Sequence, residues 1–162
     1  MGQKAGKAVY KPEASLFLNL SLSALEALWE AFNDVADGFG ITLMEMQQIC
    51  GELAGELRLN RAKLDERVQQ LFVVFDDDEN GLVDAIEFLS TIAVASGMTI
   101  RDKLEYVFNC YDFDGSQQLT IDEVTLAMKC TLSGLCKLSG TAPPREEQLE
   151  LMAMNAFTRA GR

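Results

Sequence analysis

Residues 76–87 read Asp-Asp-Asp-Glu-Asn-Gly-Leu-Val-Asp-Ala-Ile-Glu, and their spacing determines how the rest of the chain is interpreted. Side chains that carry oxygen stand at loop positions 1, 3, 5, 9 and 12: Asp76, Asp78, Asn80, Asp84 and Glu87. Gly81 stands at position 6, where such a loop turns sharply, and Leu82 at position 7 offers only its backbone carbonyl. Calcium takes about six to eight oxygen ligands, and Glu87 can supply two of them. The spacing therefore predicts a calcium loop between two helices, in preference to a solvated acidic turn.

A second loop follows at residues 112–123, which read Asp-Phe-Asp-Gly-Ser-Gln-Gln-Leu-Thr-Ile-Asp-Glu. Its expected ligands are the side chains of Asp112, Asp114, Ser116, Thr120 and Glu123 and the backbone carbonyl of Gln118. Gln117 stands where glycine is expected, and a non-glycine residue at positive φ typically costs about 1 kcal/mol. This loop also has fewer ligand carboxylates, so we predict that it binds calcium more weakly than residues 76–87.

The two loops and their apolar flanks resemble the EF-hand calcium-binding superfamily over about residues 20–160. The chain is similar to the neuronal calcium sensor, calcineurin B and calaxin type, whose members carry further helix-loop-helix units. The resemblance implies an all-α, calmodulin-like fold of EF-hand pairs, with Ca²⁺ as the cofactor.

A degenerate hand is expected at residues 34–45, before the first good loop. Asp34 and Glu45 occupy positions 1 and 12, but positions 3 and 5 hold no oxygen ligand. Ile41 at position 8 can still form a short β bridge with Val83, the residue at position 8 of the next loop. We therefore expect a structural hand without metal, and neuronal calcium sensors also have an inactive first hand.

Apolar periodicity and capping residues predict the helices around these loops. Ser23 and Glu26 form a candidate capping box for the first helix, and Thr99 caps the helix that enters residues 112–123. The other expected helices span 43–57, 61–75, 85–95, 121–133 and 145–159. Ser133-Gly134 is expected to break the helical pattern after residue 133.

The last expected helix resembles the entry to a fourth loop, which the sequence does not contain. We therefore expect Leu149, Met152 and Phe157 to lie against the third hand or another molecule, and Leu119 to have no partner strand. The predicted organisation is a flexible tail at 1–15, an EF-hand pair at 16–97, and at 98–162 a third hand with the entering helix of a missing fourth.

Composition limits the classes of partner. The 162 residues contain 25 acidic and 14 basic side chains, for a net charge of −11. This balance argues against nucleic acid, because a protein binds phosphates through basic residues. The chain has four cysteines without paired spacing and no histidine, which argues against zinc and predicts reduced thiols.

Neither a signal peptide nor a membrane span is evident, so we expect a cytoplasmic protein, with the cilium or cytoskeleton as narrower alternatives. Membrane attachment would require myristoylation of Gly2, which is not favoured because Gly6 replaces the preferred Ser or Thr.

The leading functional hypothesis is a calcium-responsive sensor or adaptor that receives an amphipathic helix of a partner protein. Candidate groove residues are Phe72, Phe88, Ile92, Met98, Phe108, Met128 and Met152, although plain core packing is favoured for most of them taken singly. One alternative is a structural subunit held constitutively in a cytoskeletal or ciliary assembly, and another is a calcium buffer. An enzyme is disfavoured, since the chain lacks histidine and a phosphate-binding loop.

Overall fold

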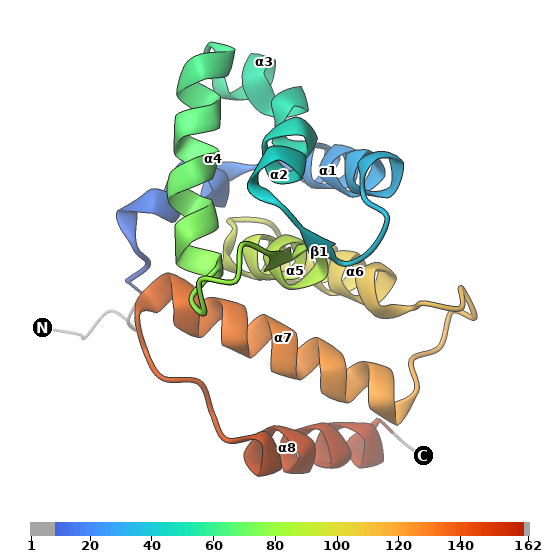
Figure 1. Cartoon of the computed structure of the whole chain (residues 1–162). Helices are drawn as coiled ribbons and strands as arrows, with labels where there is room; N and C mark the ends of the chain where they lie inside the picture. The colour runs from blue at the N-terminus through green and yellow to red at the C-terminus, as the bar shows by residue number, and fades with distance from the viewer. Residues whose placement is uncertain (1–8, 161–162) are drawn as a thin grey trace, which may run out of the picture.

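A computed structural model describes residues 9–160 and shows a chain of helices with two very short strands (Figure 1). The helices are α1 (Leu22–Val35), α2 (Leu43–Cys50), α3 (Ala54–Leu57), α4 (Arg61–Phe75), α5 (Ala85–Ala95), α6 (Ile100–Tyr111), α7 (Ile121–Ser139) and α8 (Glu146–Arg159). The strands are β1 (Gly40–Ile41) and β2 (Val83–Asp84), and 3₁₀ turns lie at Pro12–Ala14, Phe17–Asn19 and Gly51–Leu53. The predicted all-α class is confirmed, and the helices form EF-hand helix-loop-helix units: α1–α2, α4–α5 and α6–α7.

The first two hands form a pair through their loops. Strands β1 and β2 are antiparallel, and Ile41 lies opposite Val83, as the position-8 alignment predicts. The backbone N–H of Ala85 extends this bridge by donating to the Phe39 carbonyl at 2.8 Å. Ile41 and Val83 are both fully buried, so the bridge also contributes two side chains to the core.

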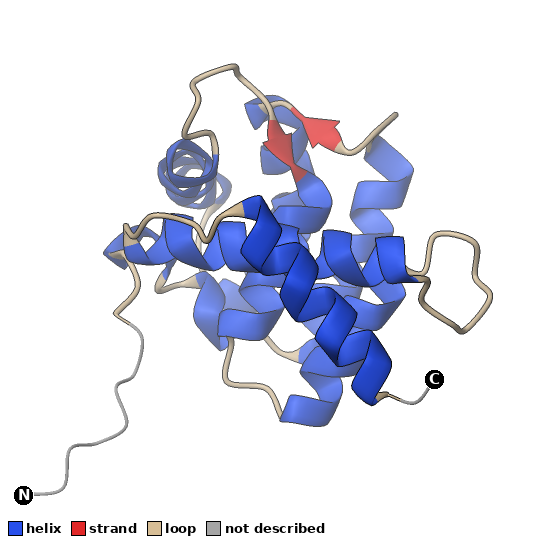
Figure 2. Ribbon diagram, turned by 90° about the horizontal axis from the view of Figure 1, so that it is seen from below, coloured by secondary structure: helices blue, strands red, loops and turns tan. Residues whose placement is uncertain are grey.

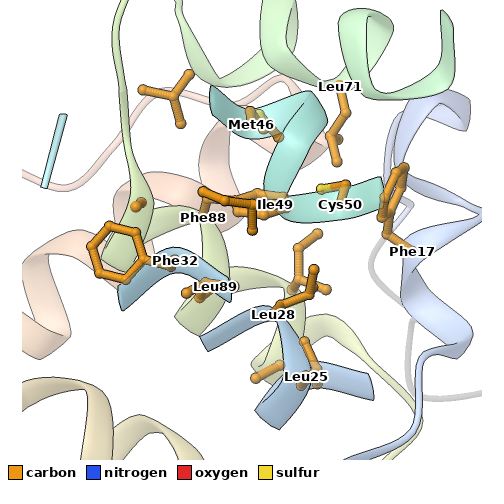
Figure 3. Packing of buried hydrophobic residues seen from close by; sticks show 14 of the residues in the cluster. Phe17, Leu25, Leu28, Phe32, Met46, Ile49, Cys50, Leu71, Phe88 and Leu89 are labelled. Atoms are coloured by element: carbon orange, nitrogen blue, oxygen red, sulfur yellow. The ribbon is translucent and has the colours of Figure 1, made fainter. Parts of the chain in front are cut away.

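The hydrophobic core lies between these two hands (Figure 3). Leu28 of α1, Ile49 of α2 and Leu89 of α5 point into it together, and each of them is buried. The same cluster continues to Tyr111 of α6 and Leu138 of α7. The third hand therefore packs directly on the first two, and α7 contacts α4, α5, α6 and α8.

Helix α7 is longer than the sequence predicts. The expected break at Ser133-Gly134 is wrong, because α7 continues to Ser139 and ends at Gly140, whose φ is 71°. Gly134 is buried where α7 crosses α5, and a Cβ atom there would collide with the Thr91 side chain. A glycine often ends a helix, but here it allows two helices to approach closely.

Two further boundaries differ from prediction. Helix α1 is capped by Ser21 instead of Ser23, because the Ser21 hydroxyl accepts from the Ala24 N–H at 3.2 Å. The predicted helix 43–57 is interrupted by a 3₁₀ turn at Gly51–Leu53, where the Arg61 guanidinium lies against Gly51.

The end of the predicted tail is packed where the structure describes it. The Lys11 N–H donates to the Leu138 carbonyl at 2.6 Å, and Ala14 and Phe17 are fully buried. Gly2, the residue considered for myristoylation, lies outside the described residues.

Helix α8 lies along α7, on the side of α7 away from α5 (Figure 1). As predicted, Leu149 packs inward, whereas the side chains of Met152 and Phe157 remain 46% and 39% exposed. Within residues 9–160 the β1–β2 pair is the only sheet, so Leu119 has no partner strand there. No helix in this described part is long and apolar enough to cross a membrane.

Candidate metal sites in the second and third hands

Both predicted calcium loops share one pattern of backbone hydrogen bonds, and each begins with an irregular segment, 76–82 or 112–120, of the kind that Figure 2 colours tan. In the loop at 76–87, the Asp76 carboxylate accepts the backbone N–H groups of Asn80 at 3.1 Å and Gly81 at 3.0 Å. In the loop at 112–123, the position-1 carboxylate accepts the corresponding N–H groups at positions 5 and 6 at 3.1 and 3.0 Å. The first carboxylate of each loop is thus held in place by the backbone that curls around it.

Each loop contains two residues in the left-handed region, at positions 4 and 6. The loop at 76–87 has Glu79 at φ 56° and Gly81 at φ 82°, whereas the loop at 112–123 has Gly115 at φ 66° and Gln117 at φ 64°. The predicted positive φ of Gln117 is confirmed, but position 4 was missed. Each loop has one glycine and one strained residue, so backbone strain does not distinguish them.

The carboxylates of the loop at 112–123 converge. Asp112, Asp114 and Glu123 each offer an oxygen within 4.8 Å of the others, and within residues 9–160 this is the only such group. Hydrogen bonds from the Ser116 hydroxyl and N–H hold the pKa of Asp114 below its ordinary value, so this carboxylate stays ionised. Three carboxylate oxygens in one small space are the donor set that a hard cation takes.

The remaining expected ligands of this loop line the same turn. The Ser116 hydroxyl donates to the Gln118 carbonyl at 2.9 Å, so these two oxygens lie side by side. The Thr120 hydroxyl accepts from the Glu123 N–H, and a Glu123 oxygen accepts from the Thr120 N–H at 2.8 Å. This capping box starts α7 and fixes the loop's last carboxylate.

The loop at 76–87 is assembled differently at its last position. Near its start, the Asn80 amide donates to Asp78 at 3.1 Å, and the Asn80 side-chain oxygen accepts from the Leu82 N–H at 2.8 Å. Asp84 caps α5 by accepting the Glu87 N–H at 2.9 Å. The Glu87 carboxylate, however, is paired with Lys137 of α7 rather than with the loop's other acids.

The partner of Glu87 is held closely. Lys137 Nζ lies 2.7 Å from Glu87 Oε1, donates to the Phe75 carbonyl at 3.0 Å, and is 3.5 Å from Asp77. Burial raises the pKa of Glu87, against the opposing effect of Lys137. Burial alone would lower the pKa of Lys137, but the two carboxylates hold it above its ordinary value. The structure thus gives a reason to reverse the predicted ranking of the loops.

The degenerate first hand offers no comparable group. Glu45 accepts the Thr42 N–H at 2.8 Å, so its carboxylate caps α2. Phe39 stands at the position of the turn glycine, and its ring centroid lies 5.7 Å from that of Phe113 in the third-hand loop. This hand contacts the third loop through an aromatic pair.

Five of the seven candidate groove residues fall into two groups, and the other two, Met98 and Phe108, are half-buried elsewhere. Phe72, Phe88 and Ile92 are buried in the core. Met128 and Met152, by contrast, line an apolar pocket between α5, α6, α7 and α8, together with Val94, Val107, Ala127, Thr131, Leu132 and Leu135.

Comparison with curated proteins gives modest matches to calcium-binding proteins. "Calcium-binding protein NCSA" of Dictyostelium discoideum is 28% identical over 145 residues, which cover 87% of this chain and 71% of that protein. "Guanylyl cyclase inhibitory protein" of Lithobates pipiens is 29% identical over 111 residues, 67% of this chain and 51% of that protein. "Calcium-binding protein J" of Dictyostelium discoideum is 38% identical over 55 residues, 34% of this chain and 28% of that protein.

The chain thus spans about half of the length of one of these relatives and less than a third of another. No family model matches it. A search of solved structures found no match either. Together with the loop geometry, the curated matches confirm the resemblance to EF-hand proteins of the neuronal calcium sensor type.

Proposed function

We propose that this EF-hand chain is a calcium-binding sensor that changes its contacts with a partner protein when calcium binds. The observation that carries the proposal is the convergence of Asp112, Asp114 and Glu123 in a loop with calcium-binding spacing. Relatives whose names describe calcium-binding and guanylyl cyclase-regulating proteins support the same class.

The residues assigned to calcium are those of the two loops. The loop at 112–123 would hold the ion through Asp112, Asp114, Ser116, Gln118, Thr120 and Glu123. The loop at 76–87 would hold it through Asp76, Asp78, Asn80, Leu82, Asp84 and Glu87. Bound calcium supplies positive charge that neutralises these acidic loops. We assign the first uptake to 112–123, where all three carboxylates already face one another.

The response is assigned to the helices that leave the loops. Glu123 lies in the first turn of α7, so a change in its position is passed directly to that helix. Met128, one turn further along α7, lines the apolar pocket with Met152 of α8. An amphipathic partner helix is a suitable occupant for such a surface, because methionine adapts to varied apolar side chains.

A second candidate is a subunit held constitutively in a larger assembly, such as a cytoskeletal or ciliary complex. The observation that favours it is the outer face of α8, where Leu151, Met154 and Phe157 are 59%, 58% and 39% exposed. An apolar face of this kind is typical of an interaction surface.

Hydrogen exchange measured by mass spectrometry, with calcium and with a chelator, tests the proposal. A sensor should show changed exchange in α7 and α8 when calcium is added. Glu123→Gln should abolish the change in residues 121–132 of α7, whereas Asp122→Asn should retain it because Asp122 is an exposed neighbour that is not a ligand. Calcium uptake without any change in exchange would identify a buffer, and no uptake would leave the constitutive subunit.

A further inference from the structure

The ion pair between Glu87 and Lys137 joins a calcium loop to a distant helix. Glu87 stands at position 12 of the second hand, and Lys137 stands near the end of α7 in the third hand. The side chains are 12% and 18% exposed, and their charged atoms are 2.7 Å apart. Ion pairs this sheltered from water are screened much less than surface pairs.

Lys137 reaches this position because α7 does not stop at Gly134. The close approach of Gly134 to Thr91 brings the last turn of α7 against α4 and α5. There the ammonium also donates to the Phe75 carbonyl at 3.0 Å, at the C-terminal end of α4, where cations are favoured. Lys137 is therefore positioned by the fold rather than by a flexible surface contact.

The Glu87 carboxylate cannot bind both calcium and Lys137 at the same time. Position 12 of an EF-hand loop supplies a bidentate carboxylate to calcium. The hydrogen bond between this Glu87 oxygen and the Lys137 ammonium must break before the carboxylate can turn towards Asp76 and Asp78. A cation bound in the loop and Lys137 therefore compete for the same carboxylate.

The contact between α5 and α7, which lies next to Lys137, is partly polar. Ser90 of α5 is hydrogen-bonded to the Tyr111 hydroxyl at 3.1 Å and lies 3.4 Å from Thr131 of α7. The Thr91 hydroxyl is buried here without a hydrogen-bond partner. A buried polar group without a partner costs free energy, so this helix contact is less stable than an apolar one of the same area.

We propose that Lys137 is a built-in competitor for the calcium loop at 76–87, so that filling this loop releases the C-terminal end of α7 from α4 and α5. The inference rests on the proposed calcium binding and adds its regulation. By linkage, docking of α7 lowers the calcium affinity of the loop by the same factor by which calcium weakens the docking. The docking of α7 in the third hand would thus depend on whether the loop of the second hand holds calcium.

Calcium calorimetry on a Lys137→Met variant tests the competition. Methionine keeps much of the apolar length and removes the charge. The measurement is made in a Glu123→Gln background, which leaves only the loop at 76–87 to titrate. The expected calcium affinity of the double variant is about tenfold tighter than that of the Glu123→Gln protein that keeps Lys137. Lys129→Met is the matched control, since Lys129 pairs with Glu146 at 2.7 Å on the exposed side of α7 and should change nothing.

Hydrogen exchange on the wild-type chain gives a second readout that does not depend on the variant folding. Calcium at a concentration that fills both loops should speed exchange in residues 133–139, and Lys137→Met should show that faster exchange without calcium. Equal affinities with and without Lys137, or unchanged exchange in 133–139, would overturn the inference alone. Failure of the loop at 76–87 to bind calcium in either background would overturn it together with the assignment of that loop.

Discussion

Gly134→Ala tests whether α7 really crosses α5 at the contact described. A Cβ atom at this position would overlap the Thr91 hydroxyl and lie 2.8 Å from Thr91 Cβ and 3.0 Å from its Cγ2. The neighbour is a short β-branched side chain, so it cannot move away without shifting α5. Overpacking of this kind typically costs about 1–3 kcal/mol, while alanine in place of a helical glycine returns about 1 kcal/mol.

The overlap is severe, so we expect a cost in the upper part of that range, about 2–3 kcal/mol. The expected net effect is then a loss of about 1–2 kcal/mol, which corresponds to a Tm lower by roughly 2–8 °C in a protein of this size. The assay is urea unfolding of the calcium-free protein followed by circular dichroism. Gly55→Ala is the matched control, because Gly55 lies in the helical turn α3 with nothing within 4 Å of its would-be Cβ. That variant should be as stable as wild type or slightly more so.

A double variant makes the test specific. Thr91→Ala removes two of the three clashing atoms, the hydroxyl and Cγ2, and keeps only the Cβ contact. The hydroxyl has no hydrogen-bond partner, so this change alone should cost little. Combined with Gly134→Ala, it should restore most of the lost stability. A Gly134→Ala protein as stable as wild type would refute the close approach, and with it the position given to Lys137.

Two further predictions concern backbone strain and thiol reactivity. Gln117→Gly and Glu79→Gly should each stabilise the calcium-free protein by up to about 1 kcal/mol, because both residues have positive φ. Urea unfolding measures the gain. If neither variant gained stability, the loops would have to relax without metal. Iodoacetamide should label Cys136 first and Cys50 and Cys110 last, because burial raises the pKa of both latter thiols to about 12; early labelling of Cys50 would contradict the packing.

The sequence predicts well those features that depend on neighbouring residues. Loop spacing located both calcium loops, and the position-8 alignment identified the pairing of Ile41 with Val83. Thr99 caps its helix as expected, because a capping hydroxyl needs only the backbone three residues away.

Features that depend on distant residues were missed. Gly134 resembles a helix terminator until Thr91 of another helix is seen against it. The contact between Lys137 and Glu87 joins residues fifty positions apart, and the sequence places Lys137 beyond the expected end of its helix. The left-handed residue at position 4 did leave a signal, because Gly115 occupies it in one loop, but only the glycine at position 6 was interpreted.

The central claim is that the loop at 112–123 binds calcium, and calorimetric titration of the purified chain tests it most directly. The wild type should take up calcium with its tightest step at this loop. Glu123→Gln should remove that step, and Asp122→Asn, which removes the same charge from the adjacent residue, should retain it. A tightest step that survives Glu123→Gln unchanged would contradict the account.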